Sequence, residues 1–344
     1  MNCFLSRNYK NISGAGNKAK TDIERIMLDM GFKNVGLRQS MVRNKALSFF
    51  ITLSGVLKMP FSIRRGDILV LQYPLKKYFS FACKLAHKRG AKVIALVHDL
   101  GSFRRKALSV TKERRRLDNA DYIIAHNEKM KKWLKDNGFK AEVGTLGIFD
   151  YLSESTAPAS AATAPYSIVY AGGLSPRKNT FLYELGDHIS NFRFNLYGNG
   201  FDSSQAKGME NIDYMGFVKS DELIATAKGD FGLVWDGFSI DACTGDWGEY
   251  LRYNNPHKTS LYIRCHLPVI IWKEAALADF VKQNGIGITV DSLTELNDIL
   301  ANLTTDEYNR MKTNTIKISQ QLASGDYART ALTNAVNSIK QSSK

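Results

Sequence analysis

Short apolar segments alternate with helical segments along nearly the whole chain, and this alternation constrains the fold more than any other feature. In the first half the apolar segments include DILVLQYP, KVIALVHDL and DYIIAHN, at residues 67–74, 92–100 and 121–127. Helical segments follow them, with apolar residues at the spacing of one helix face. Strands and helices that alternate in this way form parallel sheets covered by helices on both faces. We therefore expect an α/β protein built from doubly wound domains.

A break in composition near the middle of the chain predicts two such domains. Residues 152–165, LSESTAPASAATAP, are small, contain proline and lack aromatic side chains, as is typical of a flexible linker. The alternation restarts after this segment. We expect Rossmann-like domains over residues 1–151 and 166–304, followed by C-terminal helices over 305–344. A chain of 344 residues is long enough for two hydrophobic cores.

The cysteines and the apolar segments disfavour secreted and membrane-spanning proteins. Cys3, Cys83, Cys243 and Cys265 are widely scattered, with neither disulfide-framework nor zinc spacing, so a reduced cytoplasmic compartment fits best. No apolar run follows the early charges, and we expect no signal peptide. The most apolar segment, residues 46–61, is too short and too polar to cross a bilayer.

The charge is concentrated in the first half of the chain. Residues 1–150 carry 30 Lys and Arg against 12 Asp and Glu, whereas the remainder carries 17 against 21. A basic half predicts an anionic partner, either nucleic acid, a phosphate-bearing substrate or an anionic membrane. Because no nucleic-acid module is recognisable, we expect no nucleic-acid partner. Residues 46–61 and the basic cluster at 104–116 would suit the inner leaflet of the cell membrane, while a buried helix is the alternative for 46–61.

The first motif with chemical potential is YAGGLSPRKN, residues 170–179. A strand ends in Gly172 and Gly173, and Arg177 and Lys178 follow where a helix is expected to begin. Glycines let backbone approach a ligand closely, and a helix N-terminus with two cations can hold a pyrophosphate. An ordinary glycine turn with two solvated charges is the alternative.

The second motif is YNNPHKTSLYIRCHLPVIIW, residues 253–272, where a polar loop leads into a helical segment. Asn255 and Pro256 are residue types that favour a helix start, and this structural role explains them well. It does not explain Lys258, which is expected one turn inside the helix N-terminus. We expect Lys258 to face the same strand ends as Arg177 and Lys178 and to complete a diphosphate-binding site.

Two further loops of the second half are candidates for base and sugar contacts. Gly216, Phe217 and Val218 lie between a strand and a helix, where exposed backbone can read a planar base edge, although taken alone this motif is better explained as a plain strand–turn–helix. The stretch WDGFSIDACTGDWGEYLRY offers Asp236 and Tyr250 for sugar hydroxyls, with solvent exposure as the alternative. Its acids lack the spacing of a calcium-binding EF-hand.

The first half contains a glycine loop and histidines at expected strand ends. Gly14 and Gly16, within NISGAGNKAK, would let an acceptor or a phosphate approach the backbone, but the loop is neither a complete G-x-G-x-x-G nor a P-loop. His98 and His126 follow apolar strands and are expected to face a cleft between the domains. These residues are candidates for acceptor or sugar binding.

Two acids of the first half are candidates for the general base. Asp99 follows an expected strand, and Asp150 lies at the expected hinge between the domains. A carboxylate in such a place can take the proton from a sugar hydroxyl. A capping role before a loop is the alternative for each of them.

The order of the motifs in the second half resembles the nucleotide-binding half of GT-B glycosyltransferases. The segments VYAGGLSPRKNTFLY, LVWDGFSIDACTGDWGEYLRYNNPHKTSLYI, LPVIIWKEAALADFV, VHDL, AHN and IFDYL are similar to those of bacterial β-1,6-galactofuranosyltransferases. The same pattern covers glucosyltransferases that extend O-linked GlcNAc on serine-rich adhesins. The resemblance implies two Rossmann-like domains facing a central cleft, with the donor in the second domain, the acceptor in the first and a final helix that crosses back.

Individual roles follow from the resemblance. It implies that the ribose and diphosphate of the donor are bound by Arg177, Asn255 and Lys258, and that the uracil is contacted by Gly216, Phe217 and Val218. Asp99 would lie near the transferred sugar or the acceptor. The segment KTSLYIRCH departs from many retaining GT-B enzymes because it lacks the glutamate of their ribose motif. No DxD-type site is visible, so we expect no metal and no cofactor, with cations neutralising the diphosphate.

The resemblance also implies an activity. We expect a hexosyltransferase that moves galactofuranose from UDP-galactofuranose, with inversion and in a β-1,6 linkage, onto a lipid-linked glycan in O-antigen or polysaccharide assembly. The alternatives are a UDP-glucose or UDP-GlcNAc transferase that extends O-GlcNAc on an adhesin, and a non-catalytic UDP-binding partner subunit. The expected location is the cytoplasm, with peripheral contact to the membrane, and a homo-oligomer is an open possibility.

Overall fold

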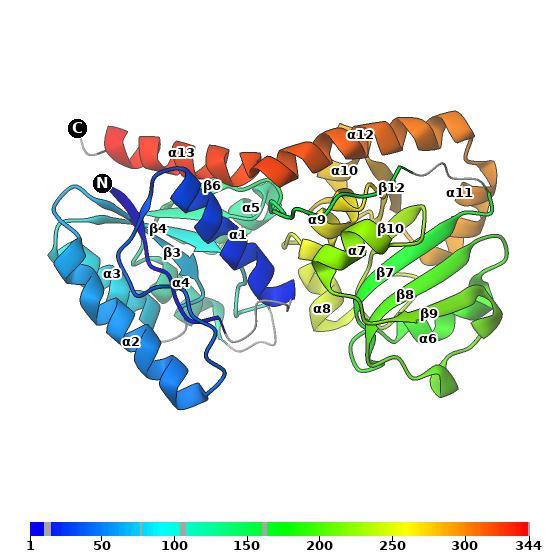
Figure 1. Cartoon of the computed structure of the whole chain (residues 1–344), viewed down its shortest axis with the longest axis horizontal. Coiled ribbons are helices and arrows are strands. Elements are labelled where there is room, and N and C mark those ends of the chain that lie inside the picture. The colour runs from blue at the N-terminus through cyan, green and yellow to red at the C-terminus, as the bar shows by residue number, and fades with distance from the viewer. Residues whose placement is uncertain (10–14, 76–77, 104–107, 160–163, 343–344) are drawn as a thin grey trace. The chain divides into compact units, whose positions relative to one another are not determined.

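The computed structural model describes residues 1–9, 15–75, 78–103, 108–159 and 164–342 (Figure 1). The chain divides into two compact units. Unit 1 consists of Met1–Asp150 together with Gly325–Lys344, and unit 2 is Tyr151–Ser324. Each unit contains a parallel sheet with its own helices, as the alternation of strands and helices predicts.

The strands of unit 1 form a parallel sheet with the order β2-β1-β3-β4-β5-β6 within the described residues. The apolar runs ILVLQY and KVIALV form the central strands β3 and β4, and nearly all of their side chains are buried. Burial of both faces is typical of strands in a parallel sheet. The strands are β1 (Asn2–Phe4), β2 (Lys33–Asn34), β3 (Ile68–Tyr73), β4 (Lys92–Val97), β5 (Tyr122–Ala125) and β6 (Glu142–Thr145).

The helices of unit 1 pack in two groups. Helix α1 contacts α13, which comes from the C-terminus, while α3 contacts both α2 and α4. In α1 the buried residues Ile23, Ile26 and Met27 follow the predicted helical spacing. The helices are α1 (Ala15–Asp29), α2 (Lys45–Ser62), α3 (Phe79–Lys88), α4 (Val110–Leu117), α5 (Glu128–Asp136) and α13 (Asp326–Gln341).

Helix α2 contains the most apolar segment of the chain and is apolar on two opposite sides. Its N-cap Asn44 accepts hydrogen bonds from the backbone N–H groups of Ala46 and Leu47. One side is buried through Gly55, Val56 and Met59. The other side leaves four large apolar side chains exposed, which are Leu47, Phe50, Leu57 and Phe61. The expectation of a buried helix therefore holds for one face, and the other face lies open.

No helix in the described part of the chain is long and apolar enough to cross a membrane. Helix α2 has 18 residues, which is long enough for a membrane-spanning helix, but it contains several polar side chains and Lys58. The prediction that residues 46–61 do not span a bilayer agrees with this finding.

Unit 2 contains a second parallel sheet, with the order β12-β11-β10-β7-β8-β9 over the residues described there. Its central strands, such as FGLV and VIIW, are completely buried. The strands are β7 (Ser167–Gly173), β8 (Arg193–Asn199), β9 (Ile212–Gly216), β10 (Phe231–Val234), β11 (Val269–Trp272) and β12 (Gly287–Val290).

The helices of unit 2 are mostly short. Residues 178–189, which the sequence predicts to be helical, form the four-residue helix α6 and a following 3-10 turn, Leu185–His188. The helices are α6 (Phe181–Glu184), α7 (Ser220–Thr226), α8 (Gly245–Tyr250), α9 (His257–Arg264), α10 (Ala278–Asn284), α11 (Leu296–Asn302) and α12 (Thr305–Ser324).

The C-terminal helical region 305–344 is divided between the two units. Helix α12 packs on α9 in unit 2, whereas α13 packs on β5, β6 and α1 in unit 1. Gly325 separates the two helices with a φ of 78°, a left-handed conformation that suits glycine. The division of the structure thus lies one helix beyond the predicted boundary at 304/305.

The beginning of the predicted linker 152–165 is attached to unit 2. Nη2 of Arg264 donates hydrogen bonds to the backbone carbonyls of Ser153 and Ser155, at 3.1 and 3.3 Å. Arg264 is itself buried, and its Nη1 donates to Ser319 of α12. These contacts hold the chain near Ser153 in place, although its composition is that of a flexible segment.

The strand orders define where a ligand is expected to bind in each unit. In unit 2 the chain runs outward from β7 through β8 to β9 and then returns to the other side of β7 as β10. In unit 1 the same reversal occurs between β1 and β3. Ligands of open α/β sheets bind outside the carboxyl ends of the strands at such a reversal. A ligand is therefore expected beside the residues that follow β7 and β10 in unit 2, and beside those that follow β1 and β3 in unit 1.

Candidate functional site

Two lysines and an aspartate meet at the reversal point of unit 2. Asp236 follows β10, Lys178 lies in the loop after β7, and Lys258 is in the first turn of α9. Oδ1 of Asp236 lies 3.1 Å from Nζ of Lys258 and 3.3 Å from Nζ of Lys178. We call these three residues the lysine–aspartate cluster. It brings together Lys178 and Lys258, which the sequence predicts to form one diphosphate-binding site.

Tyr170, in the middle of β7, completes the hydrogen bonding of the cluster. Its hydroxyl donates to Oδ1 of Asp236 at 3.1 Å and accepts from Nζ of Lys258 at 3.0 Å. Nζ of Lys258 also donates to the carbonyl of Trp235 and lies 4.2 Å from the centroid of the Tyr170 ring. The ammonium group is therefore held in a defined position by neutral and charged partners.

Burial and neighbouring charges shift the pKa values of Lys258 and Asp236 in opposite directions. Burial lowers the pKa of Lys258 to about 8, although the charge of Asp236 acts to raise it. Burial acts to raise the pKa of Asp236, but the charges of Lys258 and Lys178 outweigh it and hold the pKa below its usual value. At neutral pH Lys258 and Asp236 are thus both charged. The cluster contains two ammonium groups and one carboxylate, so one positive charge is unmatched within it.

The loop after β7 is a turn and lacks the predicted helix start. The backbone N–H groups of Lys178 and Asn179 donate to the carbonyl of Ser175, and α6 begins three residues after Lys178. A four-residue helix contributes little dipole, so a helix N-terminus is no part of the phosphate site at this loop. Gly173 and Arg177 are exposed in the same turn, and Arg177 adds a second cationic side chain to Lys178.

Asn179 and Trp247 support the cluster and were not singled out from the sequence. Nδ2 of Asn179 donates to the carbonyl of Gly173 at 2.7 Å, and its Oδ1 accepts from the N–H of Gly237 at 3.4 Å. Asn179 therefore ties the loop after β7 to the loop after β10. Nζ of Lys178 lies 5.0 Å from the ring centroid of Trp247 in α8, a cation–π contact.

The start of α9 differs from the prediction in its cap. The N-cap residue is Pro256, and no side chain in the described part of the structure caps this helix, whereas Asn255 was the expected cap. Asn255 is buried one position earlier, at 4% exposure. Oδ1 of Asn254 and Oγ1 of Thr259 are buried without a hydrogen-bond partner among the described residues. Polar atoms therefore surround the first turn of α9 next to Lys258.

Gly216, Phe217 and Val218 lie apart from the cluster along the sheet edge. They follow β9, which is separated from β7 by β8. Gly216 has a φ of 74°, and the Phe217 side chain is 57% exposed. The ring centroids of Phe201 and Tyr214 lie 5.4 Å apart, so aromatic side chains are close together at this end of unit 2. Exposed aromatic rings and backbone lie at this position, and the contact with a planar base stays a prediction.

The histidines predicted to bind the acceptor are buried in unit 1. Nε2 of His98 donates to Oε1 of Gln72 at 2.6 Å, and Nε2 of His126 donates to the carbonyl of Val97 at 3.1 Å. Both rings pack against Phe149. Burial lowers the pKa of His126 to about 3, so this imidazole is neutral at physiological pH. Their positions are those of core residues behind the strand ends.

The two candidate bases have different environments. Asp99 follows β4 and is half-buried. Asp150 is 2% exposed, and its carboxylate accepts hydrogen bonds from the backbone N–H groups of Tyr327 and Ala328 at 3.2 and 2.7 Å. Burial raises the pKa of Asp150 to about 7, although these bonds act to lower it. Asp150 therefore has the environment of a cap for α13, and Asp99 is the acid that remains open to part of the solvent.

The remaining predicted residues have plain structural positions. Gly14 lies outside the described residues, and Gly16 is the second residue of α1. Tyr250 ends α8 and is 2% exposed. Asp236, predicted to hold sugar hydroxyls or face solvent, is instead the buried partner of two lysines. Among the described residues no group of three or more His, Cys, Asp or Glu is placed to hold a metal ion.

Two family models match the chain in sequence. The model "Glucosyltransferase 3-like, N-terminal domain" matches residues 2–148, and "Glucosyltransferase 3-like, C-terminal domain" matches residues 168–335. The chain belongs to the glucosyltransferase 3-like family. It is therefore a glycosyltransferase, and a hexosyltransferase by its relatives.

Two curated relatives are similar in sequence to this member of the glucosyltransferase 3-like family. β-1,6-Galactofuranosyltransferase WbbI of Escherichia coli K12 is 32% identical over 339 residues, which covers 95% of this chain and 96% of WbbI. Glucosyltransferase 3 of Streptococcus gordonii is 34% identical over 130 residues, or 38% of each chain. The resemblance to galactofuranosyltransferases and adhesin glucosyltransferases that the motifs indicate is thus confirmed.

A solved structure confirms the fold of this glucosyltransferase 3-like protein. A glycosyltransferase from Rickettsia africae ESF-5 aligns over 98% of both chains with a TM-score of 0.57 at 12% sequence identity. The two Rossmann-like units together form the GT-B fold, as predicted. Within that fold, the lysine–aspartate cluster belongs to the half that the C-terminal family model matches.

Proposed function

We propose that this glycosyltransferase uses a UDP-sugar and that the lysine–aspartate cluster binds the diphosphate of the donor. The observation that carries the proposal is the pair of ammonium groups, Lys178 and Lys258, within 3.3 Å of one carboxylate oxygen at the reversal point of unit 2. Asp236 neutralises one of them, and Arg177 adds another cation in the same loop. A diphosphate supplies the negative charge that the remaining cations lack.

Two groups near the cluster suit the rest of the donor. The buried acceptor atoms Oδ1 of Asn254 and Oγ1 of Thr259 are without a partner in the described structure and suit ribose hydroxyls. The exposed Phe217 and the backbone at Gly216 suit a uracil ring. Asn255, Gly216 and Phe217 keep the donor roles that the resemblance implies, and Asn254 and Thr259 are proposed in addition to them.

For the reaction, we propose inverting transfer of a hexose to an acceptor hydroxyl. Asp99 takes the proton of the hydroxyl while the bond between the sugar and UDP breaks. The negative charge that develops on the leaving diphosphate is stabilised by Lys258 and Lys178, which are already held in place. No metal is required in this scheme, because the cations of the protein perform the neutralisation.

Galactofuranose is the sugar that we propose first. The relative WbbI, which matches nearly the whole chain, is named as a β-1,6-galactofuranosyltransferase. This supports UDP-galactofuranose as the donor, a β-1,6 linkage and, through the β configuration, inversion. A lipid-linked glycan in O-antigen or polysaccharide assembly is the acceptor that we propose, and the exposed apolar face of α2 in the basic unit 1 supports an acceptor at a membrane surface.

A second candidate donor is UDP-glucose. Both family models carry the name of glucosyltransferase 3, and the Streptococcus gordonii protein of that name matches part of the chain. This candidate implies transfer to O-linked GlcNAc on a serine-rich adhesin. Turnover of UDP-galactofuranose and of UDP-glucose, measured side by side, distinguishes the two, and NMR of the product reports the anomeric configuration.

The first test is calorimetric titration of the protein with UDP, with and without EDTA. We expect binding that does not change with EDTA, is lost in Lys258→Ala and is retained in Lys273→Ala. Lys273 is a matched control, because it is an exposed lysine of unit 2 that pairs with Asp291 instead of Asp236. Absence of UDP binding to the wild type, or equal binding by Lys258→Ala, would contradict the proposal.

A further inference from the structure

Unit 1 contains a pocket at its own reversal point, between the carboxyl ends of β1 and β3. It has a volume of about 700 Å³, a size typical of small-molecule sites. Residues that follow both strands line it, together with residues of α1 and α2. The donor site proposed above lies in unit 2, so this pocket is a separate feature of the molecule.

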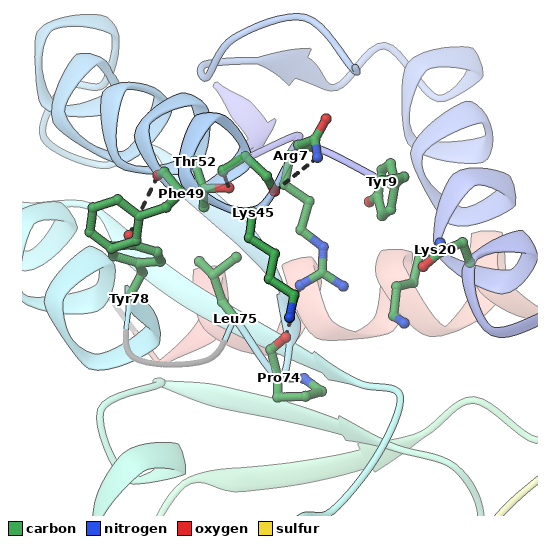
Figure 2. A pocket seen from close by; sticks show the side chains of 12 residues that line it. Arg7, Tyr9, Lys20, Lys45, Phe49, Thr52, Pro74, Leu75 and Tyr78 are labelled. Atoms are coloured by element: carbon green, nitrogen blue, oxygen red, sulfur yellow. Dashed lines mark hydrogen bonds between the residues drawn. The ribbon is translucent and has the colours of Figure 1, made fainter. Parts of the chain in front are cut away.

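The pocket is cationic. Figure 2 shows Arg7, Lys20 and Lys45 entering it from three different parts of unit 1, which are the segment after β1, helix α1 and helix α2. None of the described residues that line the pocket is acidic. A pocket with this many positive side chains and no acid in its described wall attracts an anion that carries more than one negative charge.

Arg7 is held in position before any ligand binds. Its Nη1 donates to the carbonyl of Pro74 at 2.8 Å, and its guanidinium lies 5.4 Å from the ring centroid of Tyr9. The hydroxyl of Tyr9 donates in turn to Oε1 of Glu24 at 2.5 Å. Burial raises the pKa of Glu24 to about 7, so this acid behind Tyr9 carries little of its charge below that pH.

One wall of the pocket is apolar. Phe49 of α2 and Tyr78 lie with their ring centroids 5.6 Å apart, and Leu75 lies beside them in the lining. These side chains are on the same side of the pocket as Lys45 in Figure 2. A ligand that fills the pocket must therefore combine an anionic group with an apolar group.

The pocket is linked to a residue that the sequence predicts to contact the acceptor. Nε2 of Gln72 donates to the hydroxyl of Tyr9 at 3.4 Å and to the carbonyl of Lys20 at 3.1 Å, while its Oε1 accepts from His98. His98 and the pocket thus share Gln72 as a common partner. This arrangement connects the pocket with the strand end that carries Asp99.

We propose that this pocket binds a phosphate or diphosphate ester of an apolar alcohol, as the end of the acceptor that does not react. Arg7, Lys20 and Lys45 bind the phosphate oxygens, and Phe49, Leu75 and Tyr78 contact the apolar chain. The proposal rests on the proposed function, because it assigns the acceptor of that reaction to a chemical class. A lipid phosphate supplies both the anionic and the apolar group, whereas a free sugar phosphate supplies the anionic group alone.

The test is calorimetric titration of the whole chain with geranyl diphosphate in the absence of UDP. Inorganic pyrophosphate, geraniol and N-acetylglucosamine 1-phosphate are the comparison ligands. We expect geranyl diphosphate to bind about tenfold or more tightly than each of them, because only it has both groups. Equal affinity for geraniol would overturn the anionic site, and equal affinity for pyrophosphate or the sugar phosphate would overturn the role of the apolar wall.

Variants locate the binding. In the double variant Lys20→Gln/Lys45→Gln the affinity for geranyl diphosphate is expected to fall about 100-fold, since two charge-assisted contacts are lost. Lys58→Gln is the matched control, because Lys58 is an exposed lysine of α2 outside the pocket lining. Wild-type affinity in the double variant overturns the proposal.

UDP binding measured on the same samples separates this inference from the proposed function. All variants lie in unit 1, so we expect their affinity for UDP, which reports on unit 2, to match the wild type. Circular dichroism spectra equal to that of the wild type show that unit 1 is folded. A wild type that binds UDP but not geranyl diphosphate overturns the inference and leaves the proposed function standing. A wild type that binds geranyl diphosphate with loss in the double variant, but does not bind UDP, supports the pocket and contradicts the donor site.

Discussion

Lys258 combines a buried position with a pKa of about 8, and this gives the proposed donor site a defined pH dependence. Because burial lowers this pKa below its usual value, the ammonium loses its proton as the pH rises through about 8. UDP binding needs the charged form. We therefore expect the affinity for UDP to fall between pH 7 and pH 9.

Lys258→Met separates this effect from other titrations. The variant keeps the length of the side chain without its charge, so we expect UDP binding about 10- to 100-fold weaker than in the wild type at pH 7. Because the variant lacks the titrating ammonium, its affinity for UDP should not fall between pH 7 and pH 9. Calorimetry at several pH values makes the comparison, and an equal slope in both proteins would show that another group is responsible.

Asp236 holds two cations together in the absence of a ligand. Asp236→Asn removes the carboxylate and leaves the largely buried Lys258 and the partly exposed Lys178 as uncompensated charges, which is expected to cost about 3–5 kcal/mol of unfolding free energy. Adding Lys258→Met removes one of these charges, so the double variant should be more stable than the sum of the single effects predicts. Urea unfolding of the four proteins measures the coupling. Additive effects would mean that the residues do not interact as described.

At the scale of single elements, the break between α12 and α13 depends on Gly325. Its φ is 78°, and a Cβ at this position would lie 2.7 Å from Cγ1 of the buried Ile26. Gly31 is a matched control, because its φ is 80° and nothing lies within 4 Å of its Cβ position. Gly31→Ala reports the conformational cost alone, about 1–2 kcal/mol.

Gly325→Ala is expected to cost about 1–3 kcal/mol more than Gly31→Ala, because it also crowds Ile26. The midpoints of urea unfolding compare the two variants with the wild type. Equal destabilisation by both would show that Ile26 moves aside without cost. A larger loss at Gly325 would establish that the junction at which the chain returns to unit 1 is tightly packed.

At the scale of the whole molecule, the basic first half and the outer face of α2 predict binding to anionic membranes. We expect sedimentation with vesicles that contain phosphatidylglycerol at low salt, and little sedimentation with phosphatidylcholine alone. Each basic residue near such a surface contributes about 1 kcal/mol, and salt of about 0.5 M screens this attraction.

The apolar contribution is tested on α2 itself. Phe50→Ser/Phe61→Ser removes two exposed aromatic side chains, at 60% and 89% exposure, and should weaken vesicle binding. Leu28→Ser is the control, because Leu28 is an exposed apolar residue of α1 in the same unit. Protein that stays in the supernatant with anionic vesicles at low salt contradicts the membrane contact.

Much of the fold follows from local patterns. The apolar runs at 67–74 and 92–100 became β3 and β4, and the strand expected to end in Gly172 and Gly173 became β7. The main differences are at short helices. Residues 178–189 form only a four-residue α6 and a 3-10 turn, and α8 was not predicted, since tight turns and short helices depend on contacts beyond their own spacing.

The candidate site was predictable where charge and strand ends coincide in the sequence. Lys178 and Lys258 are far apart in the chain, yet both follow expected strands or loops on one side of a parallel sheet. Tyr170, Asn179 and Trp247 were not predicted to take part. Their roles depend on where the Tyr170 hydroxyl, the Asn179 amide and the Trp247 ring lie relative to the cluster and its loops. The spacing of residues along the chain does not reveal these positions.

The sequence by itself determined the fold class, the presence of two Rossmann-like domains, the family and the cationic character of the donor loop. These properties depend on the periodicity of apolar residues and on the order of residue types along the chain. Both can be read from short segments of sequence. The tertiary structure decided the partners of each charged group. Asp236 became the partner of two lysines, Asp150 became a cap for α13, and Arg7, Lys20 and Lys45 came to share one pocket, because these arrangements depend on strand order and on packing between distant segments.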